Sequence, residues 1–597
     1  MTKKKQELDT RLMPNRFTPR TGVPDALGGG LPFNRFDEGL PTGFHRLSGM
    51  QKLNAMLDLP KAEEFVRNLP SQELHQIIHH IGLEDAAVLV PHTSPEQFKS
   101  LLYFDLWVGY DFLPERLERW LWALDEFGEH EDTSARVGHL DPEVLISLFA
   151  RWTEILKKET QDEELDLPDS PYLFASPDQR YHIHVLGDKA ADRFPLIYRL
   201  VRALYDFDLK HAHRILDDSS GSLVTENEEC ALHFRNAWLE DFGFLPFEVA
   251  VKMYGFLAPG LFKGELQSAL DGENLRIRGY EDPVLCTSLM SLRKTEGFLA
   301  EVLRGINDEE ALRSFTVAFT YLSNRASVVH GLDLTDLHSL GDESRRSFHA
   351  ISVALEYLTD GDRELGSTIL NRIDLVTIHR VGVSLLEELG RKAREVLDLL
   401  GGAGAAHLFD SPLDDIVGAV AHRFPLFVDL EHKSGVPVRR PFENLQEVEQ
   451  IRIRIAQASA VGRFFADSYG LKASQSEDVE EVASSPSDTR ISSIWLTLLL
   501  RSDWETPPTL SPVDLEQARC WLDSLDRHDV TTDLEGTLRQ RSSLLLDKLL
   551  FPEDTRSLFL DTVLAPAVER IASLPEQLGS DDTTLRLLGD LFVLDTA

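Results

Sequence analysis

The sequence contains very few cysteines. Only Cys230, Cys286 and Cys520 occur in 597 residues, and they lie far apart. This number is too small for a disulfide framework, and the wide spacing excludes a local metal site built from several cysteines. The scarcity fits a reducing compartment, so we expect a cytoplasmic protein. We interpret the three side chains as small core residues rather than as nucleophiles.

Basic residues are also scarce. The chain has 61 Lys and Arg against 99 Asp and Glu, which gives a formal net charge of −38. A surface this acidic repels nucleic acid and anionic membranes unless its basic residues cluster. The basic runs are short, such as Arg345–Arg346 and Arg439–Arg440. We therefore expect no nucleic-acid partner.

Long apolar runs and familiar catalytic motifs are absent as well. The richest apolar run, Ile494–Leu500, is followed at once by Arg501 and is far shorter than the ~20 residues of a transmembrane helix. We expect no membrane insertion. The sequence has no P-loop, no dinucleotide-binding glycine motif, no GxSxG and no kinase motif set. No cofactor is expected, and a protein without enzymatic activity is favoured.

The N-terminal third of the chain contains short helical segments. Several of them open with a proline closely followed by an acid, at Pro70, Pro95, Pro114 and Pro142. Proline suits the first helical position, and an acid in the first turn is favoured by the helix dipole. Apolar residues at helical spacing follow each start. Each segment is too short to bury its apolar face alone, so the pattern predicts a degenerate, solenoid-like helical repeat.

One later stretch predicts β-structure. Residues 172–174 and 181–185 are rich in aromatic and β-branched residues, and they flank the turn-forming sequence Ser176–Arg180. We therefore expect a mainly α fold with a minor β-hairpin near 172–185. The expected organisation is a flexible tail (1–47), a helical repeat domain (48–161), a mixed helical domain with the hairpin (162–282), a helical domain (283–472), an acidic disordered linker (473–490) and a helical C-terminal region (491–597).

The proline-acid helix starts carry a family resemblance. Leu69–Ile81 and Ser94–Leu102 combine such a start with paired Ile-Ile or Leu-Leu residues. Residues 60–150 thereby resemble the cytosolic helical repeat of MgtE-class magnesium transporters. The transporter's membrane domain and its CBS-type pair have no counterpart in the sequence, so the resemblance does not imply transport.

A second resemblance covers most of the chain. It depends on Leu69–Ala86, Phe234–Phe244, Ile378–Leu385 and Pro441–Phe442. These stretches resemble an uncharacterised bacterial family, typical of deltaproteobacteria and named only as a domain of unknown function. The family brings no assigned activity, so no site residue can be carried over from it.

Two pairs of histidines are candidate metal ligands. His75 and His79 are four residues apart on one helix face, which is a usable spacing for zinc. His182 and His184 alternate on a strand and point to one face, where with Asp178 or Asp188 they could bind a metal or act as a general base. The nearby His211 and His213 could join them. No third ligand is evident beside the first pair. Histidines in a groove or on a surface are the favoured interpretation of both pairs.

His379 and Arg380 lie in an otherwise apolar helix. Buried polar groups need partners, so these two side chains are expected to bridge helices or to line a groove. Bridging is the favoured interpretation.

Aromatic residues offer a candidate protein interface at Trp107, Tyr110, Trp120 and Trp122. Trp120 and Trp122 cannot share one helix face, so one of them is expected to be exposed or to meet a second layer. Exposed aromatics are typical of protein interfaces.

Three functional hypotheses follow. The first is a helical scaffold or adaptor that binds another protein through a repeat groove and exposed aromatics. The second is a regulatory module that senses a small ligand or a divalent metal. The third is an enzyme of unfamiliar type centred on His182 and His184.

Overall fold

The computed structural model describes residues 47–128, 130–160, 163, 165–220, 224–271, 295–432, 435–472, 490–502, 507–508, 513–525, 532–578 and 593–594. Apart from their edge residues 47 and 490, the predicted tail (1–47) and acidic linker (473–490) lie outside these ranges. Cys286 does too.

The predicted mainly α fold is confirmed. The first group of helical elements is α1 (Gly49–Leu57), α2 (Ala62–Asn68), α3 (Ser71–Ile81), α4 (Leu83–Ala86), η4 (Ala87–His92), α5 (Pro95–Asp105), α6 (Pro114–Phe127), α7 (His130–Gly138), α8 (Pro142–Trp152), α9 (Ala190–Phe207), α10 (Leu209–Ser219), α11 (Val224–Leu239) and η5 (Glu240–Phe242). None of the helices in the described part of the chain combines the length and the apolar character that crossing a membrane requires.

The second group of helical elements covers more of the chain, and it includes the longest of the described helices. It comprises α12 (Phe247–Ala250), η6 (Val251–Tyr254), α13 (Pro259–Asp271), α15 (Phe298–Gly305), α16 (Glu309–His330), α17 (Leu337–Thr359), α18 (Arg363–Arg372), α19 (Leu375–Leu399), η8 (Ala403–Leu408), α20 (Leu413–Ala421), α21 (Leu445–Tyr469), α22 (Ile491–Arg501), α23 (Leu515–Ser524), α24 (Thr532–Lys548) and α25 (Glu553–Leu578). Short strands accompany it: β6 (Phe427–Asp429) pairs with β7 (Val438–Arg440), and β8 (Val513–Asp514) pairs with β9 (Val593–Leu594).

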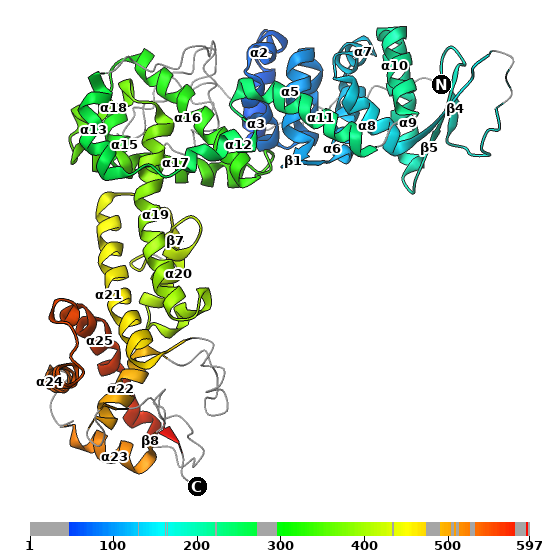
Figure 1. Cartoon of the computed structure of the whole chain (residues 1–597). Helices are drawn as coiled ribbons and strands as arrows, with labels where there is room; N and C mark the ends of the chain where they lie inside the picture. Colours follow the sequence, from blue (N-terminus) through cyan, green and yellow to red (C-terminus); the bar gives the residue numbers. More distant parts are fainter. Residues whose placement is uncertain are drawn as a thin grey trace, which may run out of the picture.

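The molecule is bent into two limbs (Figure 1). From the bend outward, α2 to α10 follow one another along the first limb, and α11 runs back over α8 and α5 toward the group α12 to α18. The second limb contains α19, α20 and α21 and continues into α22 to α25. Helices α17 and α19 pack against each other where the limbs meet.

Two hydrophobic cores underlie this shape. The first extends along the chain from Leu53 to Phe244 and also includes Leu334, and the second extends from Met253 to Ile571. The predicted boundary at residue 161 therefore falls inside the first core. Cys230 and Cys520 belong to neither core because both are exposed, so the interpretation of these two residues as core residues is wrong.

The proline-acid pattern predicted the helix starts correctly. Helices α5, α6 and α8 begin at Pro95, Pro114 and Pro142. Ser94 caps α5, because its Oγ accepts a hydrogen bond from the backbone N–H of Gln97 (3.1 Å). Asp141 precedes α8 without capping it, and its carboxylate instead accepts a hydrogen bond from Lys99 Nζ (2.7 Å).

The predicted hairpin is present and belongs to a larger sheet. Strand β4 (Leu173–Ala175) pairs antiparallel with β5 (Tyr181–Val185), and β3 (Thr153–Lys157) pairs with the other edge of β5. A third strand and packing on helices give such a hairpin the stability that two strands lack in water. A second small hairpin, β1 (Trp107–Val108) with β2 (Asp111–Phe112), connects α5 to α6.

Candidate ligand pocket

The four candidate interface aromatics divide into two groups. Trp107 and Trp120 are buried, with exposed fractions of 1% and 0%, whereas Tyr110 and Trp122 are 63% and 44% exposed. Trp120 is held in the core partly by its Nε1–H, which donates to Asp105 Oδ2 (2.6 Å). Trp107 and Trp120 are therefore core residues, which corrects their assignment to a surface.

The strand histidines do not assemble the predicted site. His182 and His184 share the face of β5 opposite to the buried Tyr181, Ile183 and Val185. Asp178, the proposed partner, instead bonds His213 Nε2 at 2.7 Å and the Tyr205 hydroxyl at 2.9 Å.

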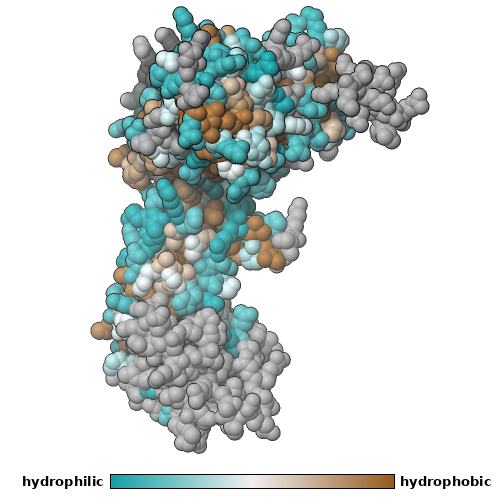
Figure 2. All heavy atoms as spheres, turned by 90° about the vertical axis from the view of Figure 1, so that its right-hand side faces the viewer, coloured by the Kyte–Doolittle hydropathy of each residue, from teal (hydrophilic) through white to brown (hydrophobic). Residues whose placement is uncertain are grey.

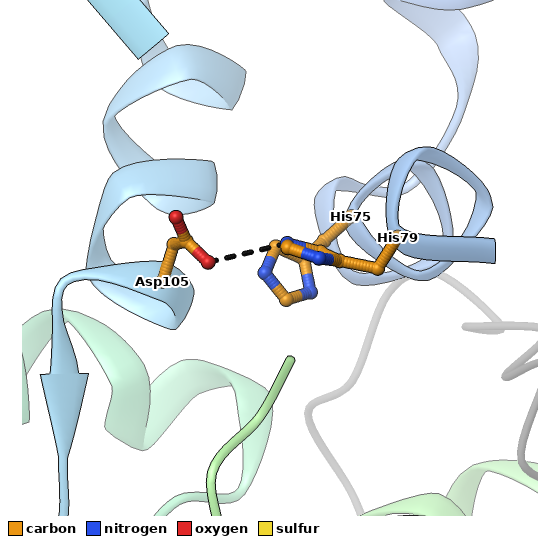
Figure 3. Close-up of side chains that lie close together, drawn as sticks. All are labelled: His75, His79 and Asp105. Carbon is orange, nitrogen blue, oxygen red and sulfur yellow. Dashed lines mark ion pairs between the residues drawn. The ribbon is translucent and has the colours of Figure 1, made fainter. Parts of the chain in front are cut away.

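The helical histidines do gain a third potential ligand. His75 and His79 on α3 face Asp105, the last residue of α5 (Figure 3). Glu84 and Asp85 lie nearer in sequence, but neither belongs to this cluster. Sequence reasoning missed Asp105 because nothing local to either helix indicates that the end of α5 lies beside this face of α3.

A cavity of about 160 Å³ lies where the two limbs meet, and we call it the elbow pocket. Elements from both sides of the bend line it: η6, α16 and α17 from one side, and α19 with the loops around 423–425 and 441–442 from the other. Most of its lining is apolar. Tyr254, Arg346, His379, Glu387 and Arg423 supply the polar groups.

A buried hydrogen-bond network adjoins the pocket. The Tyr254 hydroxyl lies 3.0 Å from His330 Nε2 and 3.2 Å from Glu343 Oε1. Arg346 donates to the other oxygen of the same carboxylate at 2.6 Å. Because a hydroxyl has a single proton, Tyr254 donates to one of its two neighbours and accepts from the other.

Burial sets the protonation of this network. Desolvation raises the pKa of Glu343 to about 7, although Arg346 and the Tyr254 hydroxyl oppose the shift. Desolvation also lowers the pKa of His330 and of His379 to about 4, with a further contribution at His330 from Arg346 and Arg423. At neutral pH both histidines are therefore uncharged, and Glu343 is partly protonated.

His379 and Arg380 combine both predicted roles. Arg380 Nε donates to the Gly255 carbonyl (3.0 Å), and so ties α19 to the loop after η6. His379 is 1% exposed, lies 3.4 Å from the Met253 carbonyl through Nδ1, and lines the pocket.

Arginine 423 gives the pocket its charge. Among the residues that the structure describes, Arg423 forms no ion pair, and its guanidinium lies 5.3 Å from the centre of the Phe424 ring. Arg346 is neutralised by Glu343 whenever that carboxyl is ionised. A mostly apolar cavity that is bordered by the exposed Arg423 guanidinium, and whose Glu387 carboxylate is paired with Arg394, suits a small organic anion.

Comparison with known proteins agrees with the sequence-based resemblance at the family level. The chain belongs to a family of unknown function (DUF6178), whose match covers residues 40–593. No curated protein and no solved structure matches it significantly. Two of the stretches that carry the resemblance, 378–385 and 441–442, contribute residues to the elbow pocket.

Proposed function

We propose that the protein is a regulatory module that senses a small organic anion in the elbow pocket. The observation that carries this proposal is a largely apolar cavity whose walls come from both limbs and which is bordered by the exposed guanidinium of Arg423. The hypothesis of a small-ligand sensor, made from the sequence, thereby gains a defined site.

The size and lining of the pocket narrow the class of ligand. A volume of about 160 Å³ is smaller than the ~300–1,000 Å³ of sites for drug-sized molecules. Val251, Val383 and Phe442 offer apolar contacts, and the guanidinium of Arg423 can donate two parallel hydrogen bonds to a carboxylate. A compact carboxylate with an aliphatic or aromatic body fits this combination.

The position of the pocket suggests how binding acts at a distance. A ligand that touches α17 on one side and the 423–425 loop on the other stabilises the arrangement in which both walls are close. Such a ligand favours one arrangement of the two limbs only to the extent that it binds this arrangement more tightly than the others. The output of the module would be the angle between its limbs.

A thermal-shift titration of the full chain tests the proposal. The probes are benzoate and isobutyrate, each compared with its neutral amide. A ligand that binds only the folded state raises the melting temperature with concentration. We expect the carboxylates to do so and the amides to have little effect.

Matched arginine variants locate the site. Arg423→Gln is expected to abolish the shift. Arg391→Gln is the control, since Arg391 is an exposed residue of α19 paired with Glu395 (2.7 Å) and does not line the pocket. A rise in melting temperature with carboxylates that persists in Arg423→Gln would contradict the proposal. The absence of any such rise in the wild type would contradict it as well.

The adaptor hypothesis is a second candidate, favoured by an exposed aromatic pair on α6. Trp122 and Phe127 are 44% and 46% exposed, and their rings meet edge to face at 6.2 Å. Figure 2 shows one face of the upper limb, on which hydrophobic residues gather in a patch amid a mostly hydrophilic surface; tryptophan is not among the strongly hydrophobic residues of that colouring. Apolar patches with a polar rim are typical of protein-binding surfaces. The repeat groove would then present these aromatics to a partner.

A pull-down from the native host, followed by mass spectrometry, tests the adaptor hypothesis. A stable partner captured by the wild-type chain and lost with Trp122→Ala/Phe127→Ala would support it. Failure to capture any partner, or equal capture by the variant, counts against it.

The resemblance of residues 60–150 to the magnesium-transporter repeat leads to a separate proposal of Mg²⁺ sensing. A melting temperature indifferent to Mg²⁺ would argue against that role. An enzyme centred on His182 and His184 is less favoured, because neither residue lines the elbow pocket.

A further inference from the structure

Three side chains of the first limb converge from two helices. His75 and His79 are one turn apart on α3, and Asp105 ends α5. One potential ligand atom of each lies within 4.8 Å of those of the other two. The closest pair is His79 Nε2 and Asp105 Oδ1, at 3.2 Å, and Figure 3 shows the three groups facing one another.

Both histidines bring a buried nitrogen into this cluster. His75 Nε2 makes no hydrogen bond to any described residue, and His79 Nε2 lies 3.2 Å from Asp105 Oδ1. His75 is only 2% exposed, so water cannot readily compensate. Buried polar atoms without a partner are costly and uncommon in folded proteins. A metal ion is one partner that would use the lone pairs of both nitrogens at once.

The surroundings prepare Asp105 as a ligand. Trp120 Nε1 donates to Asp105 Oδ2 at 2.6 Å, which fixes the carboxylate with Oδ1 toward His79. Outer hydrogen bonds of this kind orient metal ligands and are a regular part of metal sites. The indole donor sits on a core residue, so the orientation is rigid.

The local charge also favours a cation. Arg116 approaches Asp105 Oδ1 only to 4.0 Å and is bonded to Asp333 through Nη1 (3.1 Å). With two carboxylates and one guanidinium, the ionised groups carry a net charge of −1 before any metal binds. The neighbouring arginine therefore does not cancel the attraction for a divalent ion.

A fourth coordination position is available beside His75. A cavity of about 20 Å³ borders this residue and is also lined by polar side chains of α16, including Ser323, Asn324 and Ser327. That volume accommodates a single water molecule. Two imidazoles, one carboxylate and one water make the usual open tetrahedral set of zinc.

We propose that His75, His79 and Asp105 bind a divalent transition metal, with zinc as the preferred ion. Zinc–nitrogen bonds of about 2.0–2.1 Å require the ligand atoms to lie roughly 3.3 Å from one another, so atoms that are now up to 4.8 Å apart must approach by as much as about 1.5 Å. Because the cavity at the fourth position reaches α16, the bound ion would fasten the first limb to the group of helices at the bend.

The test is metal binding by the full chain after its metal has been removed with a chelator. The probes are Zn²⁺ and Co²⁺, with Mg²⁺ for comparison. We expect one Zn²⁺ per chain by elemental analysis, a visible absorption band typical of tetrahedral Co²⁺, and a rise in melting temperature with Zn²⁺ that exceeds any rise with Mg²⁺.

Variants assign the ion to this cluster. Asp105→Asn keeps the shape of the side chain, and His75→Gln/His79→Gln removes both imidazoles. Each is expected to lose the cobalt band and at least tenfold in Zn²⁺ affinity. His80→Gln is the matched control, since His80 lies on the same helix but is exposed and outside the cluster.

Folding is monitored separately by circular dichroism, and the less disruptive His79→Gln replaces any variant that fails to fold. Tight binding that survives Asp105→Asn and the double histidine variant would overturn the assignment. So would a chain that takes up Mg²⁺ and Zn²⁺ equally, or one that binds neither ion above the level of the double variant.

Discussion

Gln72 and Asn324 lie 252 residues apart and exchange two hydrogen bonds. Gln72 Nε2 donates to Asn324 Oδ1 at 2.9 Å, and Asn324 Nδ2 donates to Gln72 Oε1 at 3.0 Å. Asn324 Nδ2 also donates to the Phe242 carbonyl at 2.6 Å. Both side chains are buried, at 6% and 4% exposure. This amide pair joins α3 to α16 beside the cluster of His75, His79 and Asp105, and holds the first limb on the helices of the bend.

Replacing one partner of this pair should loosen the junction. Asn324→Leu has a similar volume but leaves the Gln72 amide and the Phe242 carbonyl without this partner. Each buried polar group that loses a hydrogen bond lowers the free energy of unfolding by roughly 1–3 kcal/mol. We expect a lower melting temperature, and faster hydrogen exchange in α3 and α16 than in α21.

The double variant Gln72→Leu/Asn324→Leu is the control. It removes both polar partners, so its destabilisation should be clearly smaller than the sum of the two single effects. Additive single effects would show that the two amides do not stabilise each other.

Glu343 should make stability depend on pH. Its pKa is about 7 in the folded protein because of burial, against 4.5 for an unperturbed glutamate. The folded state therefore holds this proton more tightly than the unfolded state. The contribution of Glu343 is most favourable below pH 4.5 and is lost as pH rises toward 7, by roughly 3 kcal/mol in total.

The measurement is the difference in stability between the wild type and Glu343→Gln across this pH range. We expect the wild type to lose stability relative to the variant as pH rises from 4.5 to about 7, and the difference to level off above that. A difference that does not change with pH would contradict the raised pKa.

Gly382 is where α17 and α19 approach most closely to each other's backbone. A Cβ at this position would lie 2.0 Å from the Ala350 carbonyl oxygen, so any larger residue forces the helices apart. Gly382→Ala should destabilise the protein by about 1–3 kcal/mol or more. It should also weaken carboxylate binding, because Ala350 and Val383 line the elbow pocket.

Gly264→Ala in α13 is the comparison. No atom of the described residues lies within 4 Å of the Cβ that it adds, and alanine is the better helix former, so this variant should be neutral or up to about 1 kcal/mol more stable. Equal melting temperatures for the two variants would contradict the close contact at Gly382.

Local signals in the sequence predicted much of the fold and little of the sites. The start of α5 could be predicted because Ser94, Pro95 and Glu96 act within a single helical turn. The pairing of α3 with the end of α5, which brings Asp105 to the histidines, depends on tertiary packing. The elbow network needs Tyr254, His330 and Glu343 from three separate elements, and no spacing rule relates such residues.

Trp120 and Trp122 illustrate the same limit within a single helix. The helical period assigns them to different faces, but it does not say which face is inward. The buried carboxylate of Asp105 and the packing of Phe98 against the Trp120 ring determine that choice. The fold class follows from patterning, whereas the site follows from contacts between distant segments.

These two tryptophans provide the last prediction. Trp120→Ala should destabilise the first limb by about 3–5 kcal/mol, because it opens a cavity and removes the donor to Asp105. Trp122→Ala should change stability by less than about 1 kcal/mol, since this side chain is 44% exposed. Thermal melting of both variants beside the wild type measures the contrast. If Trp122→Ala destabilises as strongly as Trp120→Ala, then Trp122 is a packing residue, and the case for a protein-binding surface on α6 fails.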